Sequence, residues 1–285
     1  MSIFDGFARR RNRRFTENFL GVKLMETVMR EEWVKTSSGV NVRVHVHAPA
    51  TGAVKFPAVV FVPGGASRGT DYDYKGEISA WETAGLGHVV VTYDPSGRGG
   101  SGGVEDHWGP ASQMELSEII RWTAQLPQTD PDRIGVVSFS IGVAIATGAL
   151  ARFPTAPVRF LFDWEGPSSR KIITRNDTHK PLARFPSSNA AFWDEREASR
   201  FIGDMECGYF RYQAQVDHVQ GTFKGHAMEL LNAATQGRAR WTRLNGNPPN
   251  ITLDPERADK YRWIPQTENH RGTMLKFLLS LWEER

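Results

Sequence analysis

Ser140 has the sequence surroundings of a catalytic nucleophile. It lies in the run IGVVSFSIGVAIATGAL (134–150), where a short apolar strand is followed at once by a helix of small residues. A serine at so sharp a strand-to-helix turn projects above the sheet, and the residues two positions before and after it must be small. Ser138 and Gly142 meet that need, although Ser138 stands where the usual pattern has glycine. We therefore predict that Ser140 attacks a carbonyl carbon, with the backbone N–H of Ile141 facing the oxyanion that forms.

The strand before Ser140 is one of several short apolar runs that alternate with segments of helical spacing. These runs cover residues 58–62, 88–93, 134–138, 158–162, 209–213 and 239–244. Nearly continuous apolar runs indicate strands that are buried on both faces, and their alternation with helices indicates a mostly parallel sheet. Residues 33–36 and 41–47, on either side of a turn, predict an antiparallel hairpin before it.

Helix ends can also be read from the sequence. Ser112 followed by Glu115 has the spacing of a capping box, so we expect a helix to start there and to end at Pro127. A second helix is expected to stop at Gly237, and a last one is expected to run through Met274, Leu275, Leu278 and Leu281. Helices are expected on both faces of the sheet.

One segment breaks the alternation. Residues 166–205 are polar and contain prolines, so we expect an excursion from the sheet. It either lies over the ligand crevice as a lid or only decorates the surface. Residues 1–29 are expected to form an N-terminal extension, and residues 30–285 one α/β domain.

Three stretches together give a resemblance to a known family. FVPGG (61–65) ends a strand, YDPSGRGGSGG (93–103) follows the next strand, and DPDRIGVVSFSIG (130–142) supplies the serine turn. In this order the three stretches resemble the α/β-hydrolase family. Within that family they resemble the branches of dienelactone hydrolase and prolyl oligopeptidase. The resemblance implies an α/β-hydrolase fold and a second oxyanion donor at the backbone N–H of Gly65.

The resemblance also implies that an acidic residue follows Ser140 in the chain and that a histidine follows the acid. Asp217, just after a predicted strand, is the expected acid that orients the histidine. Asp163 and Glu165, at the end of the preceding strand, remain alternatives. The one that is not the acid would shape the pocket.

His270 is the expected general base, because the family places its histidine after the final strand. His226 competes with it, although its position among apolar helical residues favours a packed histidine. His218 is expected only to flank the site.

Two further patterns could bind a ligand. Gly97, Gly99 and Gly102 match a dinucleotide fingerprint, but no helix begins within it, so we expect a tight loop. His45 and His47 lie on the same face of a strand as a pair of potential metal ligands, but no third ligand is evident nearby. We predict neither a cofactor nor a metal.

Composition limits the alternatives. The net charge of +3 does not indicate a polyanion partner, and the single cysteine, Cys207, cannot form an internal disulfide. Arginines gather near the start at Arg9, Arg10, Arg11, Arg13 and Arg14, which we interpret as a solvated arm and not as a nucleic-acid site. No apolar run is long enough for a membrane span, so we expect a soluble, cytoplasmic protein.

The predicted function is hydrolysis of small carboxylic esters through an acyl-enzyme. A peptidase is the nearest alternative, and a non-catalytic binding protein with the same fold is a second one. The sequence does not indicate the oligomeric state.

Overall fold

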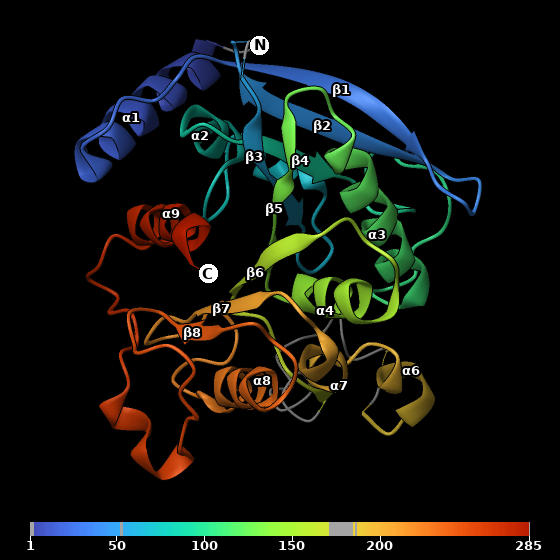
Figure 1. Cartoon of the computed structure of the whole chain (residues 1–285), viewed down its shortest axis with the longest axis vertical. Coiled ribbons are helices and arrows are strands. Elements are labelled where there is room, and N and C mark those ends of the chain that lie inside the picture. The colour runs from blue at the N-terminus through green and yellow to red at the C-terminus, as the bar shows by residue number, and fades with distance from the viewer. Residues whose placement is uncertain (1–2, 52–53, 171–184, 186, 285) are drawn as a thin grey trace.

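One sheet of eight strands forms the centre of the described chain, in the order β1-β2-β4-β3-β5-β6-β7-β8 (Figure 1). The computed structural model describes residues 3–51, 54–170, 185 and 187–284. The strands are β1 (Thr27–Lys35), β2 (Asn41–Pro49), β3 (Phe56–Val62), β4 (Val89–Tyr93), β5 (Thr129–Phe139), β6 (Val158–Trp164), β7 (Gly208–Tyr212) and β8 (Thr242–Leu244). β2 pairs antiparallel with β1 and β4, and the pairs from β4 through to β8 are parallel. The predicted hairpin and mostly parallel sheet are confirmed.

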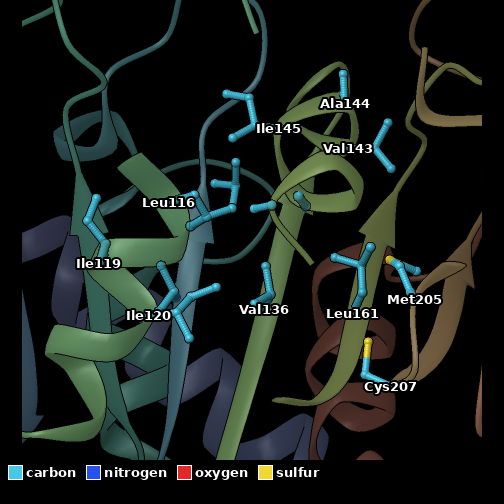
Figure 2. Close-up of a cluster of buried hydrophobic side chains, with 14 of the residues drawn as sticks. Leu116, Ile119, Ile120, Val136, Val143, Ala144, Ile145, Leu161, Met205 and Cys207 are labelled. Carbon is cyan, nitrogen blue, oxygen red and sulfur yellow. The ribbon is translucent and has the colours of Figure 1, made fainter. Parts of the chain in front are cut away.

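Helices cover both faces of this sheet, as predicted. On one face lie α3 (Pro110–Ala124), α4 (Gly142–Arg152) and α8 (Gly225–Gln236), which share one apolar core. In Figure 2, Leu116, Ile119 and Ile120 of α3 lie close to Val136 of β5. On the other face α2 (Ala80–Gly85) and α9 (His270–Ser280) share a second core with residues such as Phe210. The central strands are therefore buried from both sides, which explains why their sequences read as continuous apolar runs.

The start of α3 differs from the prediction. The helix begins at Pro110, two residues before Ser112, and the carboxylate of Asp106 accepts from the N–H groups of Ala111 and Ser112. Glu115 instead accepts hydrogen bonds from Ser96. The predicted capping box is wrong, because an acidic side chain from the preceding loop satisfies the free N–H groups and proline suits the first helical position.

The N-terminal segment forms α1 (Ile3–Leu20), which packs near α9. Thr16 of α1 donates to the buried carboxylate of Glu82 in α2 (2.8 Å). β1 begins at Thr27, so the sheet includes the last residues of the predicted extension. Within the described residues, no helix has the length and apolar character needed to cross a bilayer.

The predicted lid falls between β6 and β7. Residues 171–184 and 186 of it lie outside the described residues. The described remainder contains α6 (Ala190–Asp194), α7 (Ala198–Phe201) and a 3₁₀ turn (Ile202–Asp204), and Trp193 of α6 is fully buried. That turn (η3) continues directly from α7. Three further 3₁₀ segments lie in the described chain, at Gly69–Tyr72 (η1), Pro255–Lys260 (η4) and Leu281–Glu283 (η5).

His88, just before β4, is a buried histidine whose two ring nitrogens both have partners. Its Nδ1 lies 3.1 Å from the carbonyl oxygen of Thr83, and its Nε2 accepts from the indole N–H of Trp282 (2.8 Å). Because Nε2 accepts, the single proton of the neutral ring sits on Nδ1 and is donated to Thr83. Burial, which disfavours a charged ring, lowers the pKa of His88 to about 4.

This histidine makes folding sensitive to acid. Between the ordinary pKa of 6.5 and the folded value of about 4, the unfolded chain binds a proton that the folded chain does not, so stability is lost as the pH falls through that window. We expect His88 to contribute on the order of 3 kcal/mol to this loss, from the size of the pKa difference. Denaturant unfolding of the parent and of His88→Gln between pH 4 and 7 measures it. The difference in unfolding free energy between the two proteins should shrink with falling pH, and a constant difference would contradict the assignment.

Candidate active site

Ser140 occupies a tight turn between β5 and α4. Its backbone is in the left-handed region (φ 50°), and its N–H donates to the carbonyl oxygen of Trp164 (2.8 Å). Ser138, fully buried, fills the position two residues earlier, and a Cβ on Gly142 would lie 2.8 Å from the carbonyl oxygen of Val62. Small residues at both positions therefore permit a strained serine, as the sequence pattern requires.

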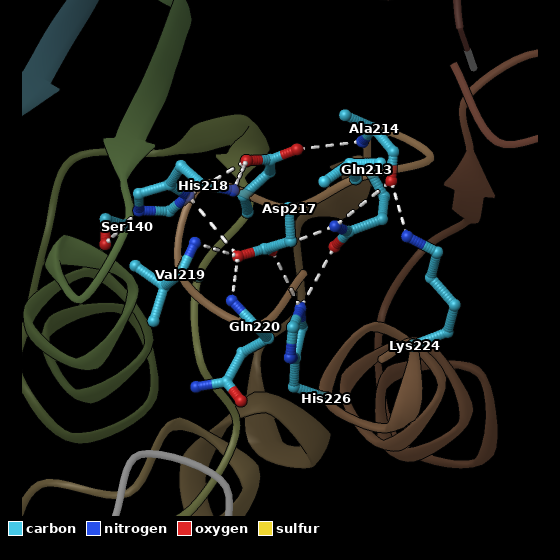
Figure 3. Close-up of polar contacts among 12 residues, drawn as sticks. Ser140, Gln213, Ala214, Asp217, His218, Val219, Gln220, Lys224 and His226 are labelled. Atoms are coloured by element: carbon cyan, nitrogen blue, oxygen red, sulfur yellow. Dashed lines mark hydrogen bonds and ion pairs between the residues drawn. The ribbon is translucent and has the colours of Figure 1, made fainter. Parts of the chain in front are cut away.

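His218 lies directly against this serine. Its Nε2 is 2.9 Å from Ser140 Oγ, and its Nδ1 is 2.9 Å from Glu165 Oε2 (Figure 3). The indole of Trp164 stacks on the imidazole with ring centres 4.4 Å apart. Both ring nitrogens and one ring face are thus fixed, and the side chain is still 30% exposed. The ring can receive a proton from Ser140 while a carboxylate supports its other nitrogen.

Glu165 is held from several sides. It follows β6 with a left-handed backbone (φ 50°), and its side chain is 2% exposed. Oε1 accepts from the N–H of Ala214 (2.8 Å), and Oε2 accepts from the N–H of His218 (3.2 Å). Because β6 and β7 are parallel neighbours, the loops after them meet at one edge of the sheet. Glu165 and His218 come from these two adjacent loops.

Asp217, the predicted acid, supports the histidine loop instead of the ring. Its Oδ1 accepts from the N–H groups of Val219 (2.7 Å) and Gln220 (2.8 Å), while the nearest approach of His218 Nδ1 is 3.5 Å. Its Oδ2 pairs with Gln213 Nε2 and with His226 Nε2 (Figure 3). Burial opposes the charge, but these hydrogen bonds, with that from His226 foremost, lower the pKa of Asp217 well below its usual range. A buried carboxylate so fixed acts as the anchor of the turn that carries His218.

The other predicted histidines lie elsewhere. His270 opens α9, and its Nδ1 lies 2.8 Å from the hydroxyl oxygen of Tyr212. His226 is fully buried in α8 against Asp217, which agrees with a packed helical histidine. Among the described residues, the structure brings Ser140 together with His218 and not with His270. This corrects the expected pairing.

Asp163, the other alternative for the acid, belongs to a buried ion pair. Its Oδ2 lies 2.6 Å from Nη1 of Arg211, and both side chains are fully buried. The hydroxyl of Tyr209 donates to the same oxygen (2.8 Å). Because both of these contacts are buried, we assign Asp163 a structural role and not that of the acid.

The backbone beside Ser140 provides two candidate oxyanion donors. Ile141 precedes the first turn of α4, where N–H groups have no partner within the helix. Gly65 has a left-handed backbone (φ 48°), and its carbonyl oxygen accepts from Trp108 Nε1 (3.2 Å). The hydroxyl of Tyr72 lies 3.5 Å from the N–H of Gly64, and its ring stacks on Phe139, next to the nucleophile. The loop after β3 is therefore fastened beside the serine.

His218 and the role of Glu165 could have been found from the sequence with one more step. The segments FDWEGP and QVDHV both begin where a buried strand ends. Since neighbouring parallel strands end at the same edge, their polar residues must meet there. The family pattern instead directed attention to a histidine after the final strand, one strand later than the one that reaches Ser140.

Comparisons with known proteins bear on this arrangement. A family model described as X-Pro dipeptidyl-peptidase (S15 family) matches residues 38–170, which include β3, β5 and Ser140. No curated protein matches the sequence. The chain has the α/β-hydrolase fold. Its resemblance to the branches of dienelactone hydrolase and prolyl oligopeptidase is confirmed.

Solved structures show the same fold at low sequence identity. Dipeptidyl peptidase 4 of Porphyromonas gingivalis has a TM-score of 0.62 at 17% identity, over 80% of this chain and 32% of that one. A puromycin-hydrolyzing peptidase of Mycobacterium tuberculosis has a TM-score of 0.64 at 16% identity, over 90% of this chain and 39% of that one. An esterase of Pyrococcus furiosus has a TM-score of 0.61 at 15% identity, over 90% of this chain and 88% of that one. The chain thus spans about a third of the length of the two peptidases and most of the length of the esterase.

A substitution at Gly64 tests how closely the loop after β3, which we call the oxyanion loop, must approach Ser140. A Cβ at Gly64 would lie 2.5 Å from the carbonyl oxygen of Phe139 and 3.1 Å from Ser140 Cβ. We expect Gly64→Ala to lower stability by about 1–3 kcal/mol, because the backbone must shift. A displacement of the serine turn should also slow its labelling by a fluorophosphonate about 100-fold.

Gly102→Ala is the matched control, since the nearest atoms to its Cβ would be 3.9 Å away. Denaturant midpoints and labelling rates of both variants are the measurements. Equal labelling rates in the two variants would show that the close approach at Gly64 is not needed.

Proposed function

We propose that this α/β-hydrolase cleaves carboxylic esters through an acyl-enzyme on Ser140, with His218 as the general base and Glu165 as the acid that orients it. The observation that carries the proposal is the unbroken chain of contacts from Ser140 Oγ through both nitrogens of His218 to Glu165 Oε2, at 2.9 Å each. The order serine, acid, histidine is the one that the family implies. Glu165 and His218 take the roles that the sequence assigned to Asp217 and His270.

The geometry supports a two-step acyl transfer. His218 Nε2 takes the proton of Ser140 as Oγ attacks the carbonyl carbon, and Glu165 stabilises the imidazolium that forms. The N–H groups of Ile141 and Gly65 are the proposed oxyanion donors. His218 then protonates the leaving alcohol, and in the second step it activates a water molecule that hydrolyses the acyl-enzyme.

The share of each chain that matches favours a small ester over a peptide. The esterase of Pyrococcus furiosus is matched over 88% of its length, whereas the two peptidases contain long segments with no counterpart in this chain. Peptidase activity is the second candidate, because the matching family model and two of these structures are peptidases. A small-molecule ester is thus the proposed substrate class.

Three substitutions in the triad test the proposal. On short-chain aryl esters, we expect Ser140→Ala and His218→Ala each to lower kcat about 10⁶-fold, and Glu165→Gln to lower it about 10⁴-fold. His270→Gln is the control, since the glutamine amide can still hydrogen-bond with the hydroxyl of Tyr212, and its kcat should stay within about tenfold of the parent's. Initial rates for the four variants are the measurement.

The opposite ranking would overturn the assignment. If His270→Gln loses activity while His218→Ala keeps it, His270 is the general base and not His218. A parent inactive on esters but active on aminoacyl amides would favour the peptidase. A parent whose Ser140 does not react with a fluorophosphonate would point to a binding protein with this fold.

Asp217 should act as a positioning residue. In Asp217→Ala, the N–H groups of Val219 and Gln220 lose their acceptor, and the loop that carries His218 is freed. We expect kcat to fall about 100-fold with KM little changed, because the base is misplaced while binding surfaces remain. In Asp217→Asn the amide oxygen can still accept from both N–H groups, so kcat should largely recover. Equal losses in both variants would show that the charge matters and not the anchoring.

A further inference from the structure

Three side chains that can bind a metal ion meet on one face of β2, away from Ser140. His45 Nδ1 lies 2.6 Å from Asp73 Oδ2, and His47 Nε2 lies 3.0 Å from Asp73 Oδ1. The two histidines are the pair that the strand pattern places on one face. The missing third ligand is Asp73, which the sequence does not reveal because it arrives from the loop after β3.

The cluster is buried and therefore already arranged. The side chains of His45, His47 and Asp73 are 10%, 1% and 6% exposed. Two imidazoles and a carboxylate, each offering one atom, lie with these atoms within 4.8 Å of one another. Folding already holds the three side chains together, so binding an ion would cost little additional conformational entropy.

A second layer of contacts orients the ligands. His45 Nε2 lies 3.1 Å from Glu31 Oε2, so a carboxylate supports the ring nitrogen that faces away from Asp73. Thr92 of β4 donates to Asp73 Oδ1 (2.8 Å). A histidine backed by a carboxylate, with its other nitrogen toward the ion, is the usual arrangement around protein-bound metals.

We propose that His45, His47 and Asp73 bind one divalent transition-metal ion, with Zn²⁺ as the ion that best suits two imidazoles and a carboxylate. The ion would replace the protons that now lie between Asp73 and the two rings. Glu31, whose side chain is 47% exposed, marks the side from which the ion enters.

The spacing suits this ion. Bonds of about 2.0–2.2 Å in a tetrahedral site place neighbouring ligand atoms about 3.3 Å apart, so the 2.6 and 3.0 Å contacts need to open by less than 1 Å. The fourth position is left to water. Mg²⁺ and Ca²⁺ prefer oxygen ligands, and two of the three ligand atoms here are nitrogens.

The position of the cluster indicates a structural role. In the sheet β4 and β3 separate β2 from β5, which at about 4.8 Å per strand puts β2 about 14 Å from the strand that ends at Ser140. The ion is therefore too far from Ser140 to activate its attack. Asp73, however, directly follows Tyr72, whose ring stacks on Phe139. The ion would fasten the end of the oxyanion loop to β2.

Metal binding by the full chain tests the proposal independently of any activity. After loading with Zn²⁺ and dialysis, we expect one ion per chain in the parent and a marked loss in His47→Gln and in Asp73→Asn. Titration with Co²⁺ should give the absorption bands of a tetrahedral site in the parent and not in His47→Gln or Asp73→Asn. Glu31→Gln should weaken binding by about 10–100-fold, as loss of an outer partner does. Zn²⁺ should raise the thermal midpoint of the parent, and Mg²⁺ should not.

Two control variants separate this cluster from other histidines. His107→Asn removes a histidine beside a single carboxylate, that of Glu105, and should bind Zn²⁺ like the parent. His218→Gln tests the Glu165, Asp217 and His218 cluster, the other described group with metal-ligand spacing, and should also retain the ion.

A parent that binds no Zn²⁺ or Co²⁺ would overturn the proposal. So would an ion that is lost in His218→Gln and kept in His47→Gln. Should His47→Gln fail to fold, Asp73→Asn and the partly exposed Glu31→Gln give the same decision, because unchanged affinity in both would exclude this site.

Discussion

The carboxylate of Glu165 is the group on which the site depends. It binds the backbone N–H and the ring Nδ1 of His218 through one oxygen, and the N–H of Ala214 through the other. One buried charge thereby joins the loop after β6 to the loop after β7 and aims the imidazole at Ser140. The cost of burying a carboxylate is offset by hydrogen bonds from three donors, two of them backbone groups that cannot rotate away.

Much of the fold followed from the sequence, since its signals are repeated and redundant. The continuous apolar runs could only be strands buried on both faces, and the helices between them required parallel pairing. The serine turn was equally legible, because steric crowding around Ser140 restricts its neighbours to small residues. The start of α3 was misread, because the donors at Ala111 and Ser112 are satisfied by Asp106 from outside the helix, and a local pattern does not contain that contact.

The proposed acid and base were harder to predict than the proposed nucleophile. Their spacing in the chain is set by loop lengths, and no steric rule ties Glu165 or His218 to a fixed sequence pattern. Asp217 and His218 are adjacent, yet one turns inward to anchor its loop and the other turns toward the serine, a choice made by the backbone after β7. The same holds for Asp73, which reaches His45 and His47 only because the loop after β3 folds over β2.

All three residues of the proposed triad lie within the first 218 residues, so the remaining residues, 219–285, contribute none of them. β8 and α9 close the sheet edge and cover an apolar face, but none of the three reacting groups comes from them. Between those two elements runs a long connection, residues 245–269, whose residues are largely exposed. Ile264 of this connection pairs with Ala214, just before the loop that carries His218, but the 3₁₀ turn Pro255–Lys260 contains no buried residue. Over evolutionary time that turn is a place where the chain can gain an insertion or a fused domain without disturbing the chemistry. In a hydrolase whose histidine follows the last strand, the same insertion would separate the base from its acid.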